Sequence, residues 1–166
     1  MRNPIYILFL LIFISCKNDT LEPFELSISD YNYSLAYSVL YQINEKELTI
    51  TFSGELENEK DSIIYSTNKL PEKKIRKLSE INIDSLGIYY SNPCIDDGDI
   101  KIYEFKKGLK TKRIQVDNYY QEDLSPVLEL INEIVPEKFK IYQEDKEELL
   151  QQQKECGRSR VIMNDE

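Results

Sequence analysis

The feature that most constrains the fold is a run of alternating apolar and polar residues near the start of the chain. Between residues 31 and 43, every odd position is tyrosine or aliphatic, and every even position except Leu40 is polar or small. A period of two places alternate side chains on opposite faces, which predicts one long strand with an apolar face. Tyr33, Tyr37 and Tyr41 also fit helical spacing, but aromatic and β-branched residues favour the strand.

Two hairpins are expected from the same kind of pattern. The polar turn at residues 44–47 leads into a second arm at residues 48–53, where Leu48, Ile50 and Phe52 alternate with threonine and serine. A third strand is expected at residues 63–67. The second hairpin is expected at residues 100–106 and 109–117, with Gly108 supplying the positive φ that a tight turn needs.

Helical spacing is clearest at residues 122–135, where Pro126 fits only the first turn and Pro136 ends the helix. Ser125 and Asp123 are both candidate N-caps. The aliphatic side chains of this segment form one broad stripe: Leu124, Val127, Leu128, Ile131, Ile134 and Val135. A short helix is also expected from Leu70-Pro71 to about residue 80, and a charged surface helix over residues 143–155.

These elements together predict an α+β fold. We expect an antiparallel sheet of about five strands from two hairpins, covered by one amphipathic helix, with a smaller C-terminal helix. The domain is expected to span residues 26–156, preceded by a polar tether up to residue 25 and followed by a flexible tail at residues 157–166.

The first sixteen residues predict export from the cytoplasm. Arg2 precedes an apolar run at residues 5–14, and Ser15 is a small residue before Cys16, as in a secretory signal peptide. The apolar run is shorter than the roughly 20 residues that a transmembrane helix needs. Residues 1–15 are therefore expected to be a signal peptide.

The segment Phe13-Ile14-Ser15-Cys16 resembles a bacterial lipobox, with Phe13 where that motif usually has leucine. Lys17-Asn18-Asp19 is similar to the lysine-then-acid sequences that follow the cysteine in surface-exported lipoproteins of the Bacteroidota. The resemblance implies a diacylglyceryl thioether on Cys16 and an acylated amino group, and more than one acyl chain anchors firmly at about 0.8 kcal/mol per buried CH₂. It also implies an outer-membrane location, facing the periplasm or the surface. A secreted protein with an incidental Cys16 is the alternative.

Beyond this segment, the body resembles only small uncharacterised lipoproteins of the same phylum, through stretches such as Asp84-Ser85-Leu86 and Asn92-Pro93-Cys94. That likeness implies no activity.

With a lipid on Cys16, the chain has two further cysteines. Outside the cytoplasm the compartment is oxidising, and Cys94 and Cys156 are two cysteines that can pair. We therefore expect them to form a disulfide, with two buried free thiols as the alternative. There is no histidine and no C-x-x-C spacing, so a zinc site or a redox dithiol has no support and no metal or cofactor is expected.

The net charge of the whole chain is −9, and cleavage of the expected signal peptide would remove Arg2 and make the charge of the mature protein more negative. A negative protein is poorly suited to nucleic acid or to anionic lipid headgroups, since both attract a cationic face. We therefore expect no nucleic-acid partner.

The most polar stretch is residues 92–99, where Asp96, Asp97 and Asp99 surround a glycine. Three carboxylates on a flexible loop could bind calcium. The spacing of an EF-hand loop is absent, and an Asp-Gly turn leading into a strand explains the same residues.

The sequence contains no recognisable catalytic motif. Without histidine, Ser-His-Asp and Cys-His schemes are excluded, and the chain has no glycine-rich phosphate loop. We therefore expect a protein that is not an enzyme and that binds a protein partner while anchored to the membrane by its lipid. An immunity-type lipoprotein that neutralises an envelope toxin, and a hydrolase with an unrecognised carboxylate site, are the alternatives.

The candidate binding patch is formed by Tyr119 and Tyr120 beside the aspartates at residues 96–99. Tyrosines provide contact area at low entropic cost. The alternative is that both tyrosines only hold the main helix against the sheet.

Overall fold

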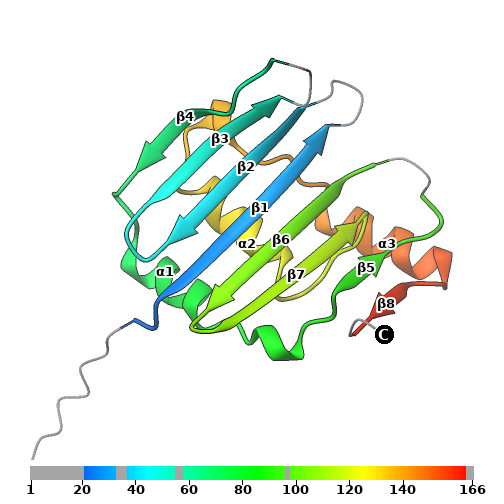
Figure 1. Ribbon diagram of the computed structural model, residues 1–166. Coiled ribbons are helices and arrows are strands. Elements are labelled where there is room, and N and C mark those ends of the chain that lie inside the picture. The colour runs from blue at the N-terminus through cyan, green and yellow to red at the C-terminus, as the bar shows by residue number, and fades with distance from the viewer. Residues whose placement is uncertain (1–20, 33–36, 55–57, 96–97, 164–166) are drawn as a thin grey trace, which may run out of the picture.

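A computed structural model describes residues 21–32, 37–54, 58–95 and 98–163. Within these residues the chain forms one eight-stranded sheet in the order β4-β3-β2-β1-β6-β7-β5-β8 (Figure 1). The strands are β1 (Phe24–Asn32), β2 (Tyr37–Asn44), β3 (Leu48–Gly54), β4 (Ser62–Thr67), β5 (Tyr89–Ser91), β6 (Ile100–Lys107), β7 (Lys110–Asp117) and β8 (Arg160–Ile162). The helices are α1 (Glu72–Ser79), α2 (Ser125–Asn132) and α3 (Lys146–Cys156), with 3₁₀ turns at Ile83–Ser85 and Glu137–Phe139.

The sheet is mixed, and β1 lies in its interior. This strand pairs antiparallel with β2 over eight residue pairs and with β6 over seven. All other neighbours are antiparallel except β5, which lies parallel to β7. The first strand of the domain is therefore central, and the two predicted hairpins lie on either side of it.

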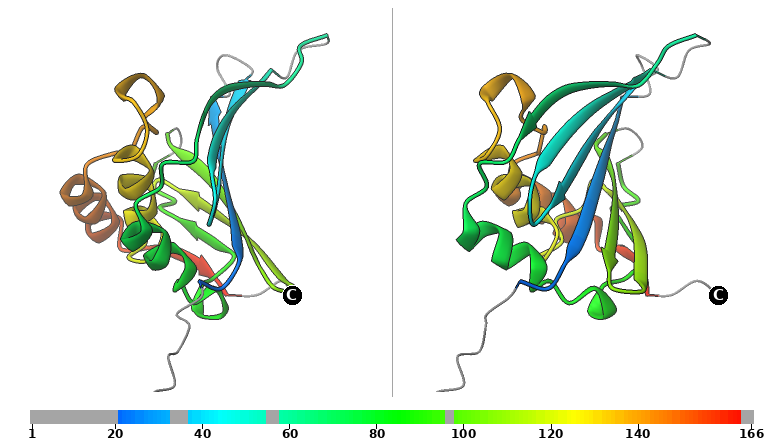
Figure 2. Two further views of the ribbon diagram at one scale, coloured as in Figure 1. Left: turned by 90° about the vertical axis from the view of Figure 1, so that its left-hand side faces the viewer. Right: turned by 60° about the vertical axis from the view of Figure 1, so that its left-hand side comes forward.

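The helices cover one face of this sheet, and the other face is open in both views of Figure 2. On β1, the even-numbered residues Phe24, Leu26 and Ile28 point towards the helices and are buried. Ser27 and Ser29 point to the open face and are half-buried. The period-two alternation therefore separates an apolar face from a polar one.

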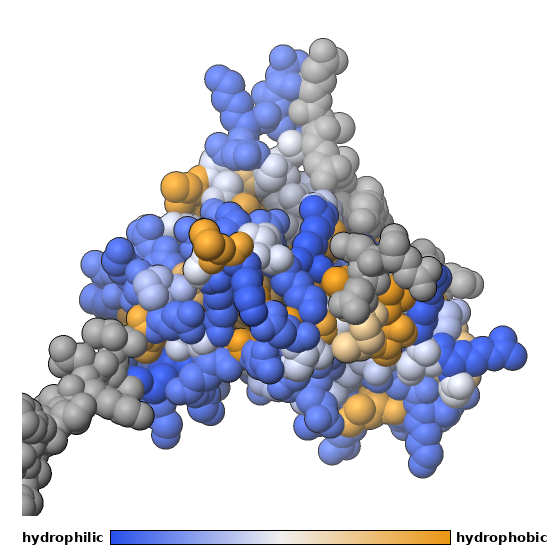
Figure 3. Space-filling model, turned by 60° about the horizontal axis from the view of Figure 1, so that its bottom comes forward, coloured by the Kyte–Doolittle hydropathy of each residue, from blue (hydrophilic) through white to orange (hydrophobic). Residues whose placement is uncertain are grey.

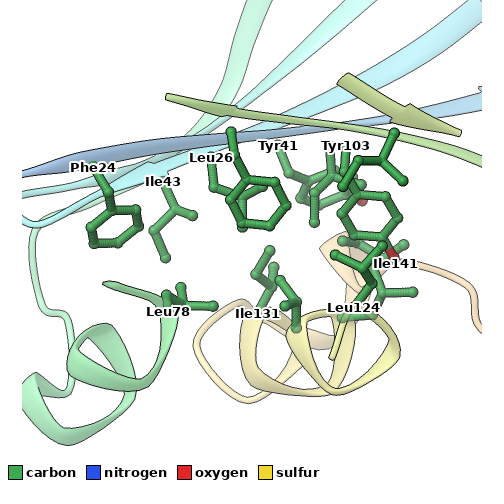
Figure 4. Close-up of a cluster of buried hydrophobic side chains, with 14 of the residues drawn as sticks. Phe24, Leu26, Tyr41, Ile43, Leu78, Tyr103, Leu124, Ile131 and Ile141 are labelled. Atoms are coloured by element: carbon green, nitrogen blue, oxygen red, sulfur yellow. The ribbon is translucent and has the colours of Figure 1, made fainter. Parts of the chain in front are cut away.

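The core lies between the strands β1, β2, β3, β6 and β7 and the helices α1 and α2 (Figure 4). Leu26 and Tyr103 lie on the sheet side, while Leu78 of α1 and Ile131 of α2 lie opposite them. Each is at most 2% exposed. Burying a leucine or isoleucine side chain contributes about 1.5–3 kcal/mol, so this layer supplies most of the stabilisation.

The C-terminus of α1 is held by a lysine from the sheet. The ammonium group of Lys107, on β6, donates hydrogen bonds to the carbonyls of Ser79 and Ile81, the latter at 2.7 Å. Cations are favourable at the negative end of a helix dipole. Lys107, the last residue of β6, therefore fixes the end of α1 on the sheet.

The turn that leads into α2 is held by Gln121, and neither predicted N-cap is present. The residue before the helix is Leu124, which makes no side-chain cap. Instead, Gln121 Oε1 accepts hydrogen bonds from the backbone N–H groups of Asp123 and Leu124, each at 2.7 Å. Ser125 Oγ accepts from the backbone of Gln121 at 3.0 Å.

The prediction of one long strand at residues 31–43 is wrong. The segment is divided between β1 and β2, which pair with Tyr31 opposite Ser38. Even-numbered residues of β1 face the helices, whereas in β2 the odd-numbered Tyr41 and Ile43 do so. The core-facing positions are therefore even-numbered in β1 and odd-numbered in β2. The sequence does not reveal this switch, because its odd-numbered positions are apolar or aromatic throughout the segment. Residues 33–36 lie outside the described residues.

The prediction of an antiparallel sheet of about five strands under one helix is also wrong. The sheet has eight strands within the described residues, one of its pairs is parallel, and both α1 and α2 contribute to the covering layer. Two of the additional strands, β5 and β8, have only three residues each. Such strands are too short to show a period of two.

The expected boundaries of the domain differ at both ends. β1 begins at Phe24, inside the segment expected to be tether, and Phe24 is 3% exposed. At the other end, β8 lies within the expected flexible tail and pairs with β5. The two hairpins, the short helix and the C-terminal helix are present close to their expected positions.

Candidate functional site

The aspartate loop and the tyrosine pair meet where β6 begins and β7 ends. The backbone N–H of Asp99 donates to Asn118 Oδ1 at 2.7 Å, and the N–H of Asn118 donates to the carbonyl of Asp99 at 3.0 Å. Gly98 has φ +151°, and a Cβ atom there would lie 2.0 Å from Asn118 Oδ1. The loop therefore needs glycine at this position. Asp96 and Asp97 lie outside the described residues.

The two tyrosines are packed rather than exposed. Tyr120 is 8% exposed, so the prediction of an exposed side chain is wrong for it, and Tyr119 is half-buried. The Tyr119 ring lies 5.6 Å from that of Tyr90. The backbone N–H of Tyr120 donates to Gln153 Oε1 at 2.7 Å, and the Lys146 ammonium lies 4.8 Å from its ring centroid. Both tyrosines join the end of β7 to neighbouring elements.

A buried ion cluster lies next to these tyrosines. Lys101 is on the helix-facing side of β6, and its side chain is 3% exposed. Its ammonium contacts Asp30 Oδ1 on β1 at 3.0 Å and also pairs with Asp99. A buried lysine is tolerated only when paired in this way. Lys101 therefore ties β1 and the start of β6 together from inside the molecule.

Glu144 approaches the same cluster from the segment before α3. Burial raises the pKa of the Asp99 carboxyl above its usual value, and the Lys101 charge opposes that rise. Burial also raises the pKa of Glu144, with the negative charge of Asp99 adding to it. Glu144 Oε2 is buried and has no hydrogen-bond partner among the described residues. The cluster thus contains three carboxyl groups around one ammonium group.

The cavity beside this cluster has a volume of about 20 Å³. That is enough for about one water molecule and far too little for a sugar ring or a peptide. Lys101 also occupies the space between Asp30 and Asp99, where a glycosidase would hold its substrate between two carboxylates. We therefore interpret the cluster as a structural ion network.

This cluster was not predicted from the sequence, although a signal was present. In the alternating segment Lys101-Ile102-Tyr103-Glu104-Phe105, the lysine shares its face with Tyr103 and Phe105. A lysine in phase with core residues implies a buried partner. Asp30, the other half of the main pair, is similarly in phase with Leu26 and Ile28.

The predicted disulfide between Cys94 and Cys156 is present, with a Cα–Cα distance of 5.8 Å. It joins the loop after β5 to the last residue of α3. This part of the prediction is confirmed, and the free-thiol alternative does not hold.

The lipidation candidate, Cys16, lies outside the described residues. Within the described ranges, no helix has the length and apolar character needed to cross a membrane. In the same part of the chain, no three acidic or cysteine side chains are arranged to hold a metal ion.

No family model, curated protein or solved structure matches the chain.

Proposed function

We propose that this chain is a lipid-anchored protein of the outer membrane that acts by binding a protein partner. The observation that carries the proposal is the Cys94–Cys156 disulfide. A structural disulfide is typical of proteins that fold outside the cytoplasm. Its formation leaves Cys16, directly after the predicted signal peptide, as the remaining cysteine of the three.

The position of β1 suits such an anchor. Its first residue, Phe24, follows Cys16 by eight positions. An extended segment of that length spans at most about 30 Å. An anchored domain would thus stay close to the bilayer, with the start of β1 turned towards it.

The open face of the sheet offers the surface for a partner. In the pairing register, Leu40 of β2 and Ile102 of β6 lie on either side of Ser29 on β1. The row continues to Thr51 on β3 and Gln115 on β7. All five side chains are half-buried. Two apolar side chains surrounded by hydroxyl and amide groups resemble the centre and rim of a protein interface.

The anchor is tested by replacing Cys16 with alanine. We expect Cys16→Ala to lose incorporation of labelled fatty acid and to leave the membrane fraction, because the thioether cannot form. Continued labelling of this variant would overturn the lipid anchor.

Binding is tested by cross-linking in intact cells. The double variant Leu40→Asp with Ile102→Asp should lose a partner that the wild-type protein captures, while its melting temperature changes little. Leu150→Asp is the matched control, since Leu150 is 42% exposed on α3 and lies away from this row. Equal capture by both variants, or turnover of a glycan or peptide by the purified protein, would overturn the proposal.

A further inference from the structure

A bulge on the edge strand β4 brings an exposed isoleucine to the open face of the sheet. Tyr65 lies opposite Ile50 and Ile63 lies opposite Thr51, so Ile64 is an extra residue between them. Ile50 is buried on the helix side, whereas Thr51 belongs to the row on the open face. Without the bulge, Ile63 would share the helix side with Tyr65, two positions away. The bulge therefore adds Ile63 to the row on the open face.

Bulky and smaller side chains alternate along this row. Across β4, β3, β2 and β1 the pairing register places Ile63, Thr51, Leu40 and Ser29 side by side. Ile63 is 69% exposed, and the other three are half-buried. Neighbouring strands lie about 4.8 Å apart, so the two aliphatic side chains are separated by about 10 Å with a smaller side chain between them. The row thus has two projections, each followed by a recess.

The rows on either side are also uncharged on these four strands. They hold hydroxyl and amide groups: Ser66, Thr49, Gln42 and Ser27 on one side, and Ser53, Ser38 and Tyr31 on the other. We call the three rows on β1 to β4 the neutral field. Acidic residues border it, among them Asp61, which accepts a hydrogen bond from Ser53 Oγ at 2.6 Å, and Glu104 beside Ser27 on β6. The neutral field is therefore an uncharged area on an otherwise highly charged chain.

The neutral field is complementary to itself under a two-fold rotation. An axis that runs along the strands, between β3 and β2, brings β3 of one copy over β2 of the other and β4 over β1. Leu40 then faces Thr51 of the other copy, and Ile63 faces Ser29, so each projection meets a recess. In the neighbouring rows, hydroxyl and amide groups face one another, and Asp61 faces the neutral Tyr31. Self-complementarity of this kind is what a two-fold symmetric interface requires.

The charge of the chain favours a second copy at this field. Two copies that each carry a net charge of −9 repel each other through most of their surfaces. That repulsion is smallest where the facing surfaces have no acidic side chains, as in the neutral field. A basic partner would instead be attracted to the acidic surface outside the field.

The direction of the axis also agrees with the proposed lipid anchor. Because the axis runs along the strands, β1 begins at the same end in both copies. Cys16 precedes Phe24 by eight positions, so both lipids would reach one bilayer. Among the described residues, that end is mostly hydrophilic, with hydrophobic side chains in small groups (Figure 3). It therefore leaves the side of the sheet as the place where anchored copies meet.

We propose that the neutral field is a dimer interface, in which the open faces of two copies stack with their strands aligned. Two sheets stacked in this way lie about 10 Å apart, as in a β-sandwich. The proposal rests on the proposed function, because it identifies the protein partner as a second copy on the same membrane.

The area of the field sets the expected affinity. Four strands and three rows cover about 19 by 20 Å, or roughly 400 Å² on each copy. The total of about 800 Å² is below the roughly 1,200–2,000 Å² of stable complexes. The dimer should thus be weak in solution and more complete when lipids confine both copies to one surface, because confinement raises the effective concentration.

The test measures self-association of the purified chain by sedimentation equilibrium. The chain lacks residues 1–15 and carries Cys16→Ala, so that no disulfide forms between copies through that thiol. We expect a reversible equilibrium between monomer and dimer between about 10 μM and about 1 mM, as suits a small interface.

Ile63→Asp and Leu40→Asp should each weaken dimerisation about tenfold or more, because each places a carboxylate in the contact without a cation. Both side chains face away from the core, so the melting temperature should change little. Leu40→Thr should weaken the dimer by removing a projection. Adding Thr51→Leu to it should restore the dimer, because a bulky side chain again faces a smaller one.

Thr111→Asp is the matched control. It makes the same change in net charge on the open face, but on β7, outside the four strands of the neutral field, and should leave the dimer intact. A chain that stays monomeric at about 1 mM, or equal weakening by Thr111→Asp and Ile63→Asp, would overturn the dimer. If the purified chain is monomeric while cells still show capture of another protein that depends on Leu40 and Ile102, the proposed function stands and the dimer fails.

Discussion

The central strands and the corner formed by β5, α3 and β8 are stabilised in different ways. β1 is paired on both sides, and its inward apolar residues are at most 3% exposed. β5 and β8 have three residues each. α3 buries only Leu149, and its Leu150 is 42% exposed. Apolar burial thus accounts for the centre but not for the corner.

The corner instead depends on a covalent bond and on polar contacts. The disulfide ties its last helix to the loop after β5. Asp145 caps α3 through the backbone N–H groups of Glu147 and Glu148, and Gln153 accepts from Tyr120. Segments with few buried apolar contacts open more readily than the core. The comparison therefore predicts that the two regions lose structure separately.

The largest effect is expected in the centre, from Lys101→Met, because Lys101 joins β1 to the start of β6. The substitution leaves the carboxylates of Asp30 and Asp99, whose side chains are 24% and 18% exposed, without their cation. Breaking a buried ion pair by removing one partner typically costs about 3–5 kcal/mol. The melting temperature should fall by roughly 10 °C, measured by circular dichroism.

Lys106→Met is the matched control, since Lys106 is half-exposed on the same strand and should change stability by less than about 0.5 kcal/mol. Adding Asp30→Asn and Asp99→Asn to Lys101→Met should recover part of the loss, because no buried charge then lacks a partner. Equal melting temperatures for the two methionine variants would show that the buried Lys101 contributes no more to the stability of the centre than an exposed lysine does.

A smaller and local effect is expected from Cys94→Ser with Cys156→Ser. The bond closes a loop with a sequence separation of 62, for which the chain-entropy model gives an upper value of about 4 kcal/mol. Hydrogen exchange should become faster in α3 and β8 first, while β1 and β6 remain protected. Loss of protection in all strands at once would instead make the corner and the centre one cooperative unit.

The sequence predicted the parts of the fold that depend on local pattern. Both hairpins, α1 and α3 follow from alternation, turn residues and helical spacing, and the cysteine count led to the disulfide. It could not show that the core-facing positions switch from even-numbered to odd-numbered between β1 and β2, because the odd-numbered side chains are apolar or aromatic in both. Nor could it show β8, because three residues are too few for a periodic pattern and their partner strand β5 is about seventy positions away in the chain.

The candidate site was predictable only in part, because burial and long-range ion pairs depend on the tertiary structure. The hydrogen bond between Asp99 and Asn118 brings the tyrosine pair next to the aspartate loop. Local sequence does not determine how deeply Tyr120 is buried, because that depends on α3 packing over the end of β7. The Lys101–Asp30 pair joins residues 71 positions apart, and only their shared phase with core residues hinted at it.

The smallest expected effect is on the stability of the centre at alkaline pH, and it depends on Tyr41. Tyr41 of β2 is 4% exposed, and its hydroxyl donates to the carbonyl of Phe139 at 3.2 Å. Burial, with the charges of Asp30 and Tyr37, raises the pKa of Tyr41 to about 12, whereas tyrosine in an unfolded chain has a pKa of about 10. Between these values the folded state holds a proton that the unfolded state releases, so the free energy of unfolding falls as pH rises.

We expect Tyr41→Phe to weaken this pH dependence by about 1–2 kcal/mol over the range from pH 10 to 12, measured by urea unfolding at fixed pH values. At neutral pH it should cost about 1 kcal/mol through the lost hydrogen bond. Tyr142→Phe is the control, because Tyr142 is 66% exposed and should change neither quantity. If wild type and Tyr41→Phe lose stability in parallel above pH 10, the alkaline sensitivity belongs to another buried group. Tyr103 is then the next to test, since burial raises its pKa as well.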